Sequence, residues 1–168
     1  MLSLVIPCRN EGVNVVLLAD RTAAALKGID YEVLFIDAST DDTGDFLRAA
    51  AEKHTNVDYI FAPELNLAGA VVLGMRSCRG DVIGVMDADL QHPPELLPTM
   101  YTEIRRGADL VAPSRLIEGG SEEGLNIFRR FTSWAARKAG QVALSRVRDI
   151  SDPTSGFFMV RRSVVGGF

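Results

Sequence analysis

The chain has few of the residues that mark disulfide-rich, zinc-binding or thiol-based proteins. Its 168 residues include two cysteines, Cys8 and Cys78, whose spacing is neither that of a zinc site nor that of a paired set. Both stand in apolar surroundings, so we expect reduced thiols in the core of a cytosolic protein. The only histidines are His54 and His92. No Ser-His-Asp or Cys-His arrangement therefore indicates nucleophilic catalysis.

Long apolar runs and an excess of one charge are also missing. No apolar run approaches the ~20 residues that a membrane-spanning helix needs. No positively charged segment precedes the first apolar run, at residues 2–7. We therefore expect a protein that is not itself integral to a membrane. The net charge of −4 disfavours nucleic acid as a partner and leaves only local basic surfaces.

The residues that are present predict one globular domain with an α/β fold. Apolar residues make up 47% of the chain, enough for a sizeable core. Strand-like runs occur at residues 2–7, 32–37, 57–62, 82–87 and 109–113. Helical patterns occur at residues 11–27, after 39–43, at 67–78 and at 94–106. This alternation predicts a Rossmann-like, mainly parallel sheet flanked by helices.

The segment Asp87-Ala-Asp-Leu-Gln-His-Pro-Pro-Glu95 follows an apolar run that is typical of a buried parallel strand. If the extended geometry continues past the strand, Asp87 and Asp89 point to the same face. Two carboxylates, with the Gln91 carbonyl as a further oxygen donor, then suit one hard cation. The alternative is that both aspartates only form turns or cap a helix. We interpret His92 as a support for this site or as a purely structural residue.

Polar residues follow other strands at the edge where ligands bind in open α/β sheets. Residues 7–11 follow the first strand, and Asp37 ends the second. Asn10 and Glu11 are candidates for ligand binding, or else they cap the next helix. Asp37 contacts a ligand or only forms a turn. Gly69 lets a ligand approach a helix start, or else it serves helix packing.

Basic residues late in the chain suit phosphate oxygens. Arg115 follows the fifth strand, and Arg129 and Ser133 stand in a helical stretch at residues 128–148, beyond a loop at residues 116–124. An arginine fork matches phosphate geometry better than the point charge of lysine. Each arginine could equally be a solvated surface residue. The stretch itself either lies on an anionic membrane surface or packs its aromatic residues on the sheet.

The segment 87–95 resembles the metal-binding motif of family 2 glycosyltransferases, especially that of the polyprenyl-phosphate mannosyltransferases. Other segments resemble the motifs of that family in the same order, from Pro7 to Phe158. These are Pro-x-x-Asn-Glu at 7–11, the aspartate segment at 37–43, the segment 66–70, Ser114-Arg115 with Arg129 and Ser133, and Asp152-Pro-Thr-Ser-Gly-Phe157. Without the resemblance, the last of these is a turn into an edge strand. The resemblance implies a GT-A-type fold.

The resemblance also implies roles for particular residues. The nucleotide-binding residues would be Pro7, Arg9, Asn10, Glu11, Asp37, Gly69, Asp87 and Ala88. The ligands of Mg²⁺ or Mn²⁺ would be Asp87, Asp89 and Gln91, and the catalytic residues Asp89, Arg115, Arg129 and Ser133. The chain departs from the family pattern where Ala38 replaces an aspartate, Ala68 a glycine, and Trp134 and Ala135 an arginine and a glycine.

The implied activity is metal-dependent, inverting transfer of mannose from GDP-mannose to a polyprenyl phosphate such as dolichyl phosphate. The enzyme would act as a peripheral protein at the cytoplasmic face of a membrane. One alternative is a UDP-glucose enzyme that uses the same lipid. Another is a nucleotide-sugar-binding fragment without turnover, because family domains continue beyond the Ser-Gly-Phe segment. We therefore expect residues 1–168 to form a single catalytic domain that lacks its C-terminal elements.

Overall fold

The structure is a computed structural model, and it describes residues 1–113 and 156–165. The chain divides into two compact units, Met1–Val111 with Phe157–Phe168, and Ala112–Gly156. The described helices and strands belong to the first unit. The expectation of a single catalytic domain stays a prediction.

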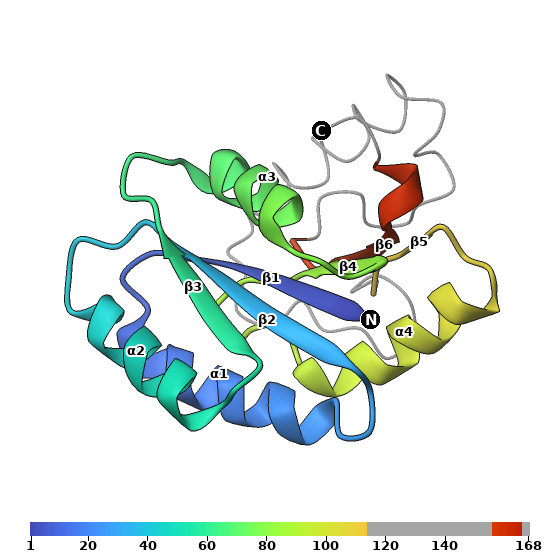
Figure 1. The fold of residues 1–168 in the computed structure, drawn as a ribbon, viewed down its shortest axis with the longest axis horizontal. Helices are drawn as coiled ribbons and strands as arrows, with labels where there is room; N and C mark the ends of the chain where they lie inside the picture. The colour runs from blue at the N-terminus through green and yellow to red at the C-terminus, as the bar shows by residue number, and fades with distance from the viewer. Residues whose placement is uncertain (114–155, 166–168) are drawn as a thin grey trace, which may run out of the picture. The chain divides into compact units, whose positions relative to one another are not determined.

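The first unit contains a six-stranded sheet in the order β3-β2-β1-β4-β6-β5. The strands are β1 (Leu2–Cys8), β2 (Tyr31–Asp37), β3 (Val57–Phe61), β4 (Val82–Val85), β5 (Leu110–Val111) and β6 (Phe158–Arg161). Strands β1 to β4 pair in parallel, and β6 runs antiparallel to both β4 and β5 (Figure 1). The predicted mainly parallel sheet is confirmed.

The structure corrects three expectations at the β4 side of the sheet. The strand expected at residues 82–87 ends at Val85, and the one expected at 109–113 has two residues, Leu110–Val111. The last apolar run forms β6, which lies between β4 and β5, so its interpretation as an edge strand is wrong. The reason is that side chains on both faces of β6 are buried. Met159 and Val160 are adjacent, and each is at most 1% exposed, in a different core cluster.

Helices cover both faces of the sheet. They are α1 (Gly12–Ala25), α2 (Thr43–Lys53), α3 (Leu67–Ser77) and α4 (Leu97–Arg106), with 3-10 turns η1 (Pro94–Leu96) and η3 (Arg162–Val164). Helices α1, α2 and α4 lie on one face, and α3 lies on the other (Figure 1). In the described ranges, no helix is both long and apolar enough to span a bilayer.

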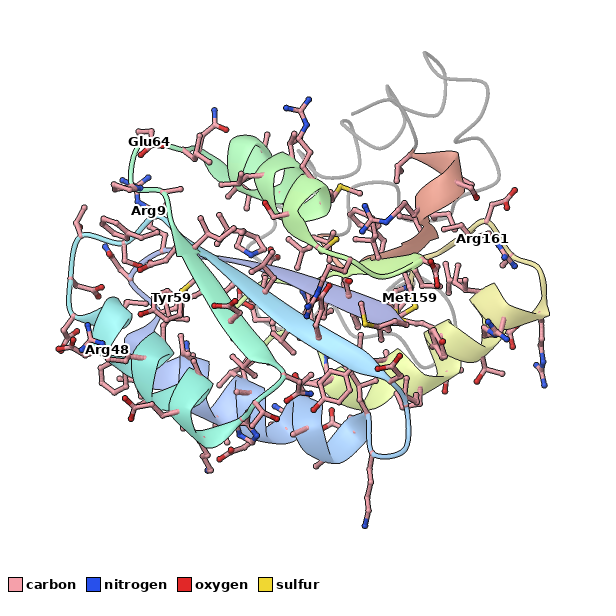
Figure 2. The ribbon with its side chains drawn as sticks, viewed as in Figure 1. Arg9, Arg48, Tyr59, Glu64, Met159 and Arg161 are labelled. Atoms are coloured by element: carbon pink, nitrogen blue, oxygen red, sulfur yellow. The ribbon has the colours of Figure 1, made fainter. Side chains whose placement is uncertain are left out.

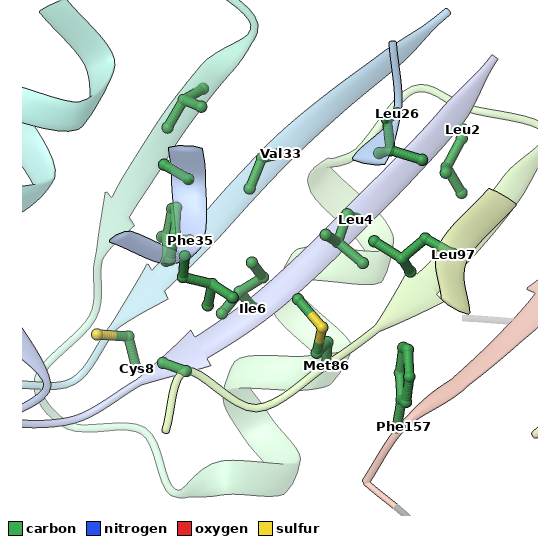
Figure 3. Close-up of a cluster of buried hydrophobic side chains, with 14 of the residues drawn as sticks. Leu2, Leu4, Ile6, Cys8, Leu26, Val33, Phe35, Met86, Leu97 and Phe157 are labelled. Carbon is green, nitrogen blue, oxygen red and sulfur yellow. The ribbon is translucent and has the colours of Figure 1, made fainter. Parts of the chain in front are cut away.

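The two hydrophobic clusters follow from the alternation of side chains along the strands. Leu2, Leu4 and Ile6 of β1 face the cluster that includes α1, α2 and α4 (Figure 3). Val5 points to the other cluster, against α3. Helix α3 approaches the sheet closely at Gly74, where a Cβ atom would lie 2.3 Å from a methyl group of Val5. Only glycine allows this approach.

Two consecutive arginines at the end of β6 bind the ends of helices in both layers. Arg161 donates hydrogen bonds to the Ile104 and Ala108 carbonyls at the end of α4 (Figure 2). Arg162 donates to the carbonyls of Met75, Cys78 and Gly80, at 3.2, 2.7 and 2.7 Å, where α3 ends. A guanidinium at a helix C-terminus satisfies carbonyls that the helix leaves unpaired and favours the helix dipole. These bonds tie β6 to α3 and to α4.

A polar network occupies the amino-terminal end of the strands. The Ser3 hydroxyl is buried, donates to Glu32 and accepts a 2.7 Å hydrogen bond from the Gly80 amide. Glu32 also forms an ion pair with Arg79 at 2.7 Å. Burial acts to raise the pKa of Glu32, but the hydrogen bonds from Ser3 and Arg79 and the charge of Arg79 outweigh it and lower this pKa.

Candidate nucleotide and metal site

The carboxyl ends of β1, β2 and β4 meet at one edge of the sheet, because these strands pair in parallel. The predicted residues in the described ranges lie in the last residues of these strands, in the loops that follow them, or at the start of α3. They are Pro7, Arg9, Asn10, Glu11, Asp37, Gly69, Asp87, Ala88, Asp89 and Gln91. Arg115, Arg129 and Ser133 lie outside the described residues, as does the stretch at 128–148. This edge is the usual ligand position in open α/β sheets.

Asn10 joins the loops that follow β1 and β2. Its backbone lies in the left-handed region, with φ of 59°, a conformation that asparagine tolerates better than most residues. Its amide donates to Ser39 Oγ at 2.8 Å, and its side-chain oxygen accepts from the Thr40 amide at 2.9 Å. Asn10 thus positions one loop against the other. Capping of α1 by its side chain is not observed.

Glu11 is the N-cap residue of α1, immediately before Gly12, but its side chain makes no capping hydrogen bond. Its carboxylate instead accepts a 2.6 Å hydrogen bond from Asn14 Nδ2. The expected cap is therefore present in position at Glu11, without a capping bond from either side chain. The structure leaves their interpretation as ligand contacts untested.

Asp37 is 1% exposed at the end of β2, and its Oδ1 accepts a 3.0 Å hydrogen bond from the Ser39 amide. The turn expected as the alternative to ligand binding is therefore present. It uses one oxygen of the carboxylate and so does not exclude a second contact. Ala38 follows, buried, with its amide bonded to the Cys8 carbonyl.

A cavity of about 170 Å³ lies between the ends of β1 and β2 and the start of α3. Its lining residues are Pro7, Cys8, Arg9, Ala38, Leu65, Asn66, Leu67 and Ala70. Figure 2 labels Arg9 at this edge. Pro7 and Arg9 were predicted to bind a nucleotide, and the cavity brings them together. A second cavity, of about 410 Å³, lies beside Asp37 and is lined by Arg48 and Tyr59 among others (Figure 2).

The start of α3 supports the packing interpretation of Gly69. Gly69 is not among the residues that line the cavity. Its amide donates to the side chain of Asn66, which caps the helix, at 2.9 Å. A Cβ atom on Gly69 would lie 3.3 Å from Leu65 Cδ2, so close packing favours glycine here. Asn66, before an apolar helical pattern, carries a recognisable capping signal that the sequence prediction did not use.

Cys8 is a wall of this cavity and not a nucleophile. It is buried and free, as is Cys78, which confirms the prediction of reduced core thiols. Burial, together with the negative charges of Asp37 and Glu11, raises the pKa of the Cys8 thiol to about 12. A thiol with that pKa is protonated near neutral pH and therefore unreactive.

The loop after β4 departs from the extended geometry on which its prediction depended. The Met86 amide still bonds to the Val5 carbonyl, at 3.2 Å, but strand pairing ends at Val85. Leu90 has φ of 63°, which turns the chain back on itself. Asp89 Oδ1 accepts a 3.0 Å hydrogen bond from the Gln91 amide. Asp89 thus forms a turn, and both aspartates stand in a loop and not on a strand.

His92 lies within this loop beside Phe157, the residue that immediately precedes β6. Its Nδ1 accepts a 3.3 Å hydrogen bond from the Asp87 amide and lies 3.7 Å from Asp87 Oδ2. Its ring stacks on Phe157, with centroids 5.2 Å apart and planes 22° apart. Phe157 precedes β6 and is 2% exposed. The sequence gives no signal that these two rings meet.

The donor atoms in this loop fit a small divalent cation. Asp87, Asp89 and Gln91 offer carboxylate and amide oxygens, which Mg²⁺ and Mn²⁺ prefer. Among the described residues, no three His, Cys, Asp or Glu side chains form a cluster that could hold a metal. Mg²⁺ sites commonly use one or two carboxylates, with water and substrate phosphates as further ligands. The loop suits a metal bound together with a phosphorylated ligand.

The comparisons with known proteins agree with this arrangement. The model of the Glycosyl transferase family 2 matches residues 3–167. A dolichol-phosphate mannosyltransferase of Pyrococcus furiosus is 39% identical over 166 residues, which are 98% of this chain and 47% of that protein. An undecaprenyl-phosphate 4-deoxy-4-formamido-L-arabinose transferase of Pseudomonas fluorescens is 40% identical over 118 residues, 67% of this chain and 35% of that protein. The chain therefore spans less than half of these relatives.

Solved structures share the fold at lower identity. A glucosyl-3-phosphoglycerate synthase of Mycobacterium tuberculosis, in complex with Mn²⁺, UDP-glucose and phosphoglyceric acid, matches with a TM-score of 0.71 and 20% identity. The match covers 98% of this chain and 57% of that one. A mannosyl-3-phosphoglycerate synthase of Rubrobacter xylanophilus matches with a TM-score of 0.72 and 20% identity, over 98% and 54% of the two chains. These neighbours have the GT-A fold, and both the family model and the mannosyltransferase similarity extend over nearly all of the sequence, so the chain belongs to glycosyltransferase family 2.

Proposed function

We propose that this chain is the donor-binding part of a metal-dependent, inverting glycosyltransferase that moves mannose from GDP-mannose to a polyprenyl phosphate. The observation that carries the proposal is the meeting of two features at one sheet edge. A cavity opens between β1, β2 and α3, and two aspartates follow the adjacent strand β4. The similarity to the Pyrococcus furiosus dolichol-phosphate mannosyltransferase supports mannose and a lipid phosphate as substrates.

The nucleoside of the donor would occupy the cavity at Pro7 and Arg9, with Asp37 and Glu11 at its margin. Asn10 would keep the walls of this pocket in register, because it bonds to the loop that follows β2. A preorganised pocket lowers the cost of ordering side chains when the ligand binds. Ala38 would leave one face of the pocket apolar, since it lines the cavity where the family resemblance expects an aspartate.

Asp87, Asp89 and Gln91 would hold Mg²⁺ or Mn²⁺ beside the diphosphate of the donor. A bound divalent cation offsets the negative charge that develops on the leaving nucleoside diphosphate. A lipid phosphate is already anionic near neutral pH, so it needs little help from a general base. It needs cationic groups to orient it for attack on the anomeric carbon, a role that we assign to Arg115 and Arg129 with Ser133.

The acceptor places the protein at the cytoplasmic face of a membrane, as a peripheral protein. Transfer with inversion would convert an α-linked nucleotide mannose into a β-mannosyl phosphate lipid. The new bond joins the lipid phosphate oxygen to the anomeric carbon, and the bond from that carbon to the nucleoside diphosphate breaks. The balanced products are the mannosylated lipid and GDP.

A transfer assay tests the proposal. The purified chain is incubated with Mn²⁺, a short-chain polyprenyl phosphate in detergent and either GDP-mannose or UDP-glucose, and the lipid product is measured by mass spectrometry. We expect a mannosyl lipid with GDP-mannose and none when a chelator is added. Formation of a lipid product with UDP-glucose but not with GDP-mannose would show that the donor is UDP-glucose. Binding of either donor without lipid product would identify a nucleotide-sugar-binding segment that needs further parts of the protein for turnover.

A further inference from the structure

We infer that His92 is a positioning residue, which holds the Asp87 backbone so that the Asp87 carboxylate is presented to the metal and donor. The inference rests on the proposed function, which assigns the Asp87 carboxylate to the metal and donor site. Its own basis is the contact of the Asp87 amide with His92 Nδ1 and the stacking of the His92 ring on Phe157. It separates two roles for His92, namely support of the site and packing alone.

The hydrogen bond determines how the imidazole can act. Nδ1 lies 3.3 Å from the Asp87 amide nitrogen and 3.7 Å from Asp87 Oδ2. The shorter contact is within hydrogen-bonding distance, and the longer one is not. An imidazole nitrogen that accepts a backbone N–H carries no proton of its own, so the neutral ring has its proton on Nε2. His92 therefore contacts the main chain of Asp87 and leaves the Asp87 carboxylate to other partners.

The ring itself is anchored from the other side. Phe157 is 2% exposed and stands immediately before β6, which pairs with β4 along its whole length. Stacking at 5.2 Å ties the His92 ring to this strand. Both ends of the contact thus lie next to paired strands, because Asp87 follows β4 and Phe157 precedes β6. The imidazole links the two strands across the loop.

The loop conformation needs such a link. Leu90 adopts φ of 63°, a region that leucine rarely occupies and that persists only where the surroundings impose it. The bond from Asp87 to His92 closes the loop around Leu90, and Pro93 and Pro94 restrict the chain beyond it. Loss of the bond would let Asp87 and Asp89 move relative to each other. Metal ligands that lose such a supporting partner typically bind about 10–100-fold more weakly.

Two substitutions separate the hydrogen bond from the stacking. His92→Phe keeps an aromatic ring on Phe157 but removes the acceptor. His92→Asn removes the ring but places an amide oxygen near the position of Nδ1. The control is His54→Phe, which alters the other histidine. His54 caps the end of α2, pairs with Asp20 at 2.7 Å and is 17% exposed, against 14% for His92.

The first readout needs neither metal nor donor. Amide hydrogen exchange is measured by NMR in the three variants and the unaltered chain. We expect the Asp87 amide to exchange about 10-fold faster in His92→Phe than in the unaltered chain, because one hydrogen bond is lost. In His92→Asn, its exchange rate should stay within about 3-fold of that in the unaltered chain. Long-range ¹⁵N correlations of the unaltered chain should place the His92 proton on Nε2. An exchange rate of the Asp87 amide that is unchanged in His92→Phe would overturn the inference. A proton on His92 Nδ1 would overturn it as well.

The second readout is Mn²⁺ binding in the presence of GDP, followed by the EPR signal of the free ion. His92→Phe should weaken binding about 10–100-fold, His92→Asn distinctly less, and His54→Phe not at all. Equal weakening by both His92 variants would overturn the role of the acceptor and favour packing alone. An unaltered chain that binds no Mn²⁺ would defeat the proposed function. The exchange of the Asp87 amide would then still decide whether His92 holds the loop.

Discussion

The two ends of the parallel strands treat carboxylates in opposite ways. At the amino end, Glu32 is paired with Arg79 and accepts a hydrogen bond from the buried Ser3. At the carboxyl end, Glu11, Asp37 and Asp89 form no ion pair with any of the described residues. Their hydrogen bonds come from neutral backbone and side-chain N–H groups. Among the described residues, Glu32 thus has a cationic partner at the amino end, whereas Glu11, Asp37 and Asp89 have none at the carboxyl end.

On the proposed function, this difference separates groups that stabilise the fold from groups that serve a ligand. A carboxylate without an oppositely charged partner contributes less to the stability of the fold than a paired one, and such costs to stability concentrate at functional sites. Backbone conformations follow the same division. The two non-glycine residues with positive φ among those described, Asn10 and Leu90, both lie at the carboxyl end. On the proposed function, the loops at the carboxyl end bind the donor, and the amino end holds the sheet together.

The largest effect should come from removing one of the charges at the carboxyl end. We predict that Asp89→Asn lowers the rate of mannosyl transfer by at least about 100-fold, because the metal loses a charged ligand where charge develops. The midpoint of urea unfolding should stay equal or rise. The matched control is Asp30→Asn, an exposed aspartate just before β2. Equal activity of the two variants would remove Asp89 from the site.

The converse holds for the amino end. Glu32→Ala leaves the buried Ser3 hydroxyl without its acceptor and Arg79 without its partner. We predict a loss of about 1–3 kcal/mol in the free energy of unfolding, with donor affinity per folded molecule unchanged. Urea unfolding followed by circular dichroism measures the first quantity, and calorimetric titration measures the second. A large loss of donor affinity in a folded Glu32→Ala chain would break the division between the two ends.

Arg162 extends the same stabilising role into the helical layer. Replacement of Arg162 by methionine keeps much of the aliphatic stem and removes three hydrogen bonds to carbonyls at the end of α3. We predict a loss of about 1–2 kcal/mol in the free energy of unfolding. Arg105→Met serves as the control, because Arg105 is an exposed residue on the last turn of α4. Equal unfolding midpoints for the two variants would show that the Arg162 bonds contribute nothing.

The smallest effect concerns pH. The pKa of Glu32 is lowered below its ordinary value of 4.5 in the folded chain, so folding favours the ionised form. The contribution of Glu32 to stability is therefore present above pH 4.5 and is lost as pH falls below that value through the folded-state pKa. We predict that the unfolding free energy of the unaltered chain falls more steeply below this pH than that of Glu32→Gln. If the unfolding free energies of the two proteins fell in parallel below pH 4.5, the stabilising role of Glu32 in the Ser3–Arg79 network would be contradicted.

The sheet was predictable from the sequence because its signal is local. Each parallel strand has a continuous apolar run, and each run is followed by a helical pattern, which together indicate a doubly wound fold. The place of β6 between β4 and β5 was not predictable in this way. It depends on pairing between residues far apart in the sequence, such as Val82 with Arg161 and Leu110 with Val160, for which no local pattern exists.

The site shows the same limit at finer scale. The spacing of Asp87 and Asp89 pointed to this loop through an extended geometry that the loop does not have, because the chain leaves the strand before Asp87. A leucine at positive φ has no sequence signature, so the turn at Leu90 could not be foreseen. The stacking of His92 on Phe157 joins residues 65 positions apart and depends on the placement of β6.

Metal-dependent nucleotide binding tests the central claim most directly. GDP and UDP are each titrated into the chain and into Asp89→Asn by calorimetry, with Mn²⁺ and again with a chelator. We predict that GDP binds the unaltered chain with Mn²⁺, and that the chelator and Asp89→Asn each weaken this binding at least about 10-fold. Nucleotide binding of equal strength in all three cases, or none to a folded chain, would contradict a metal site at the carboxyl end of β4.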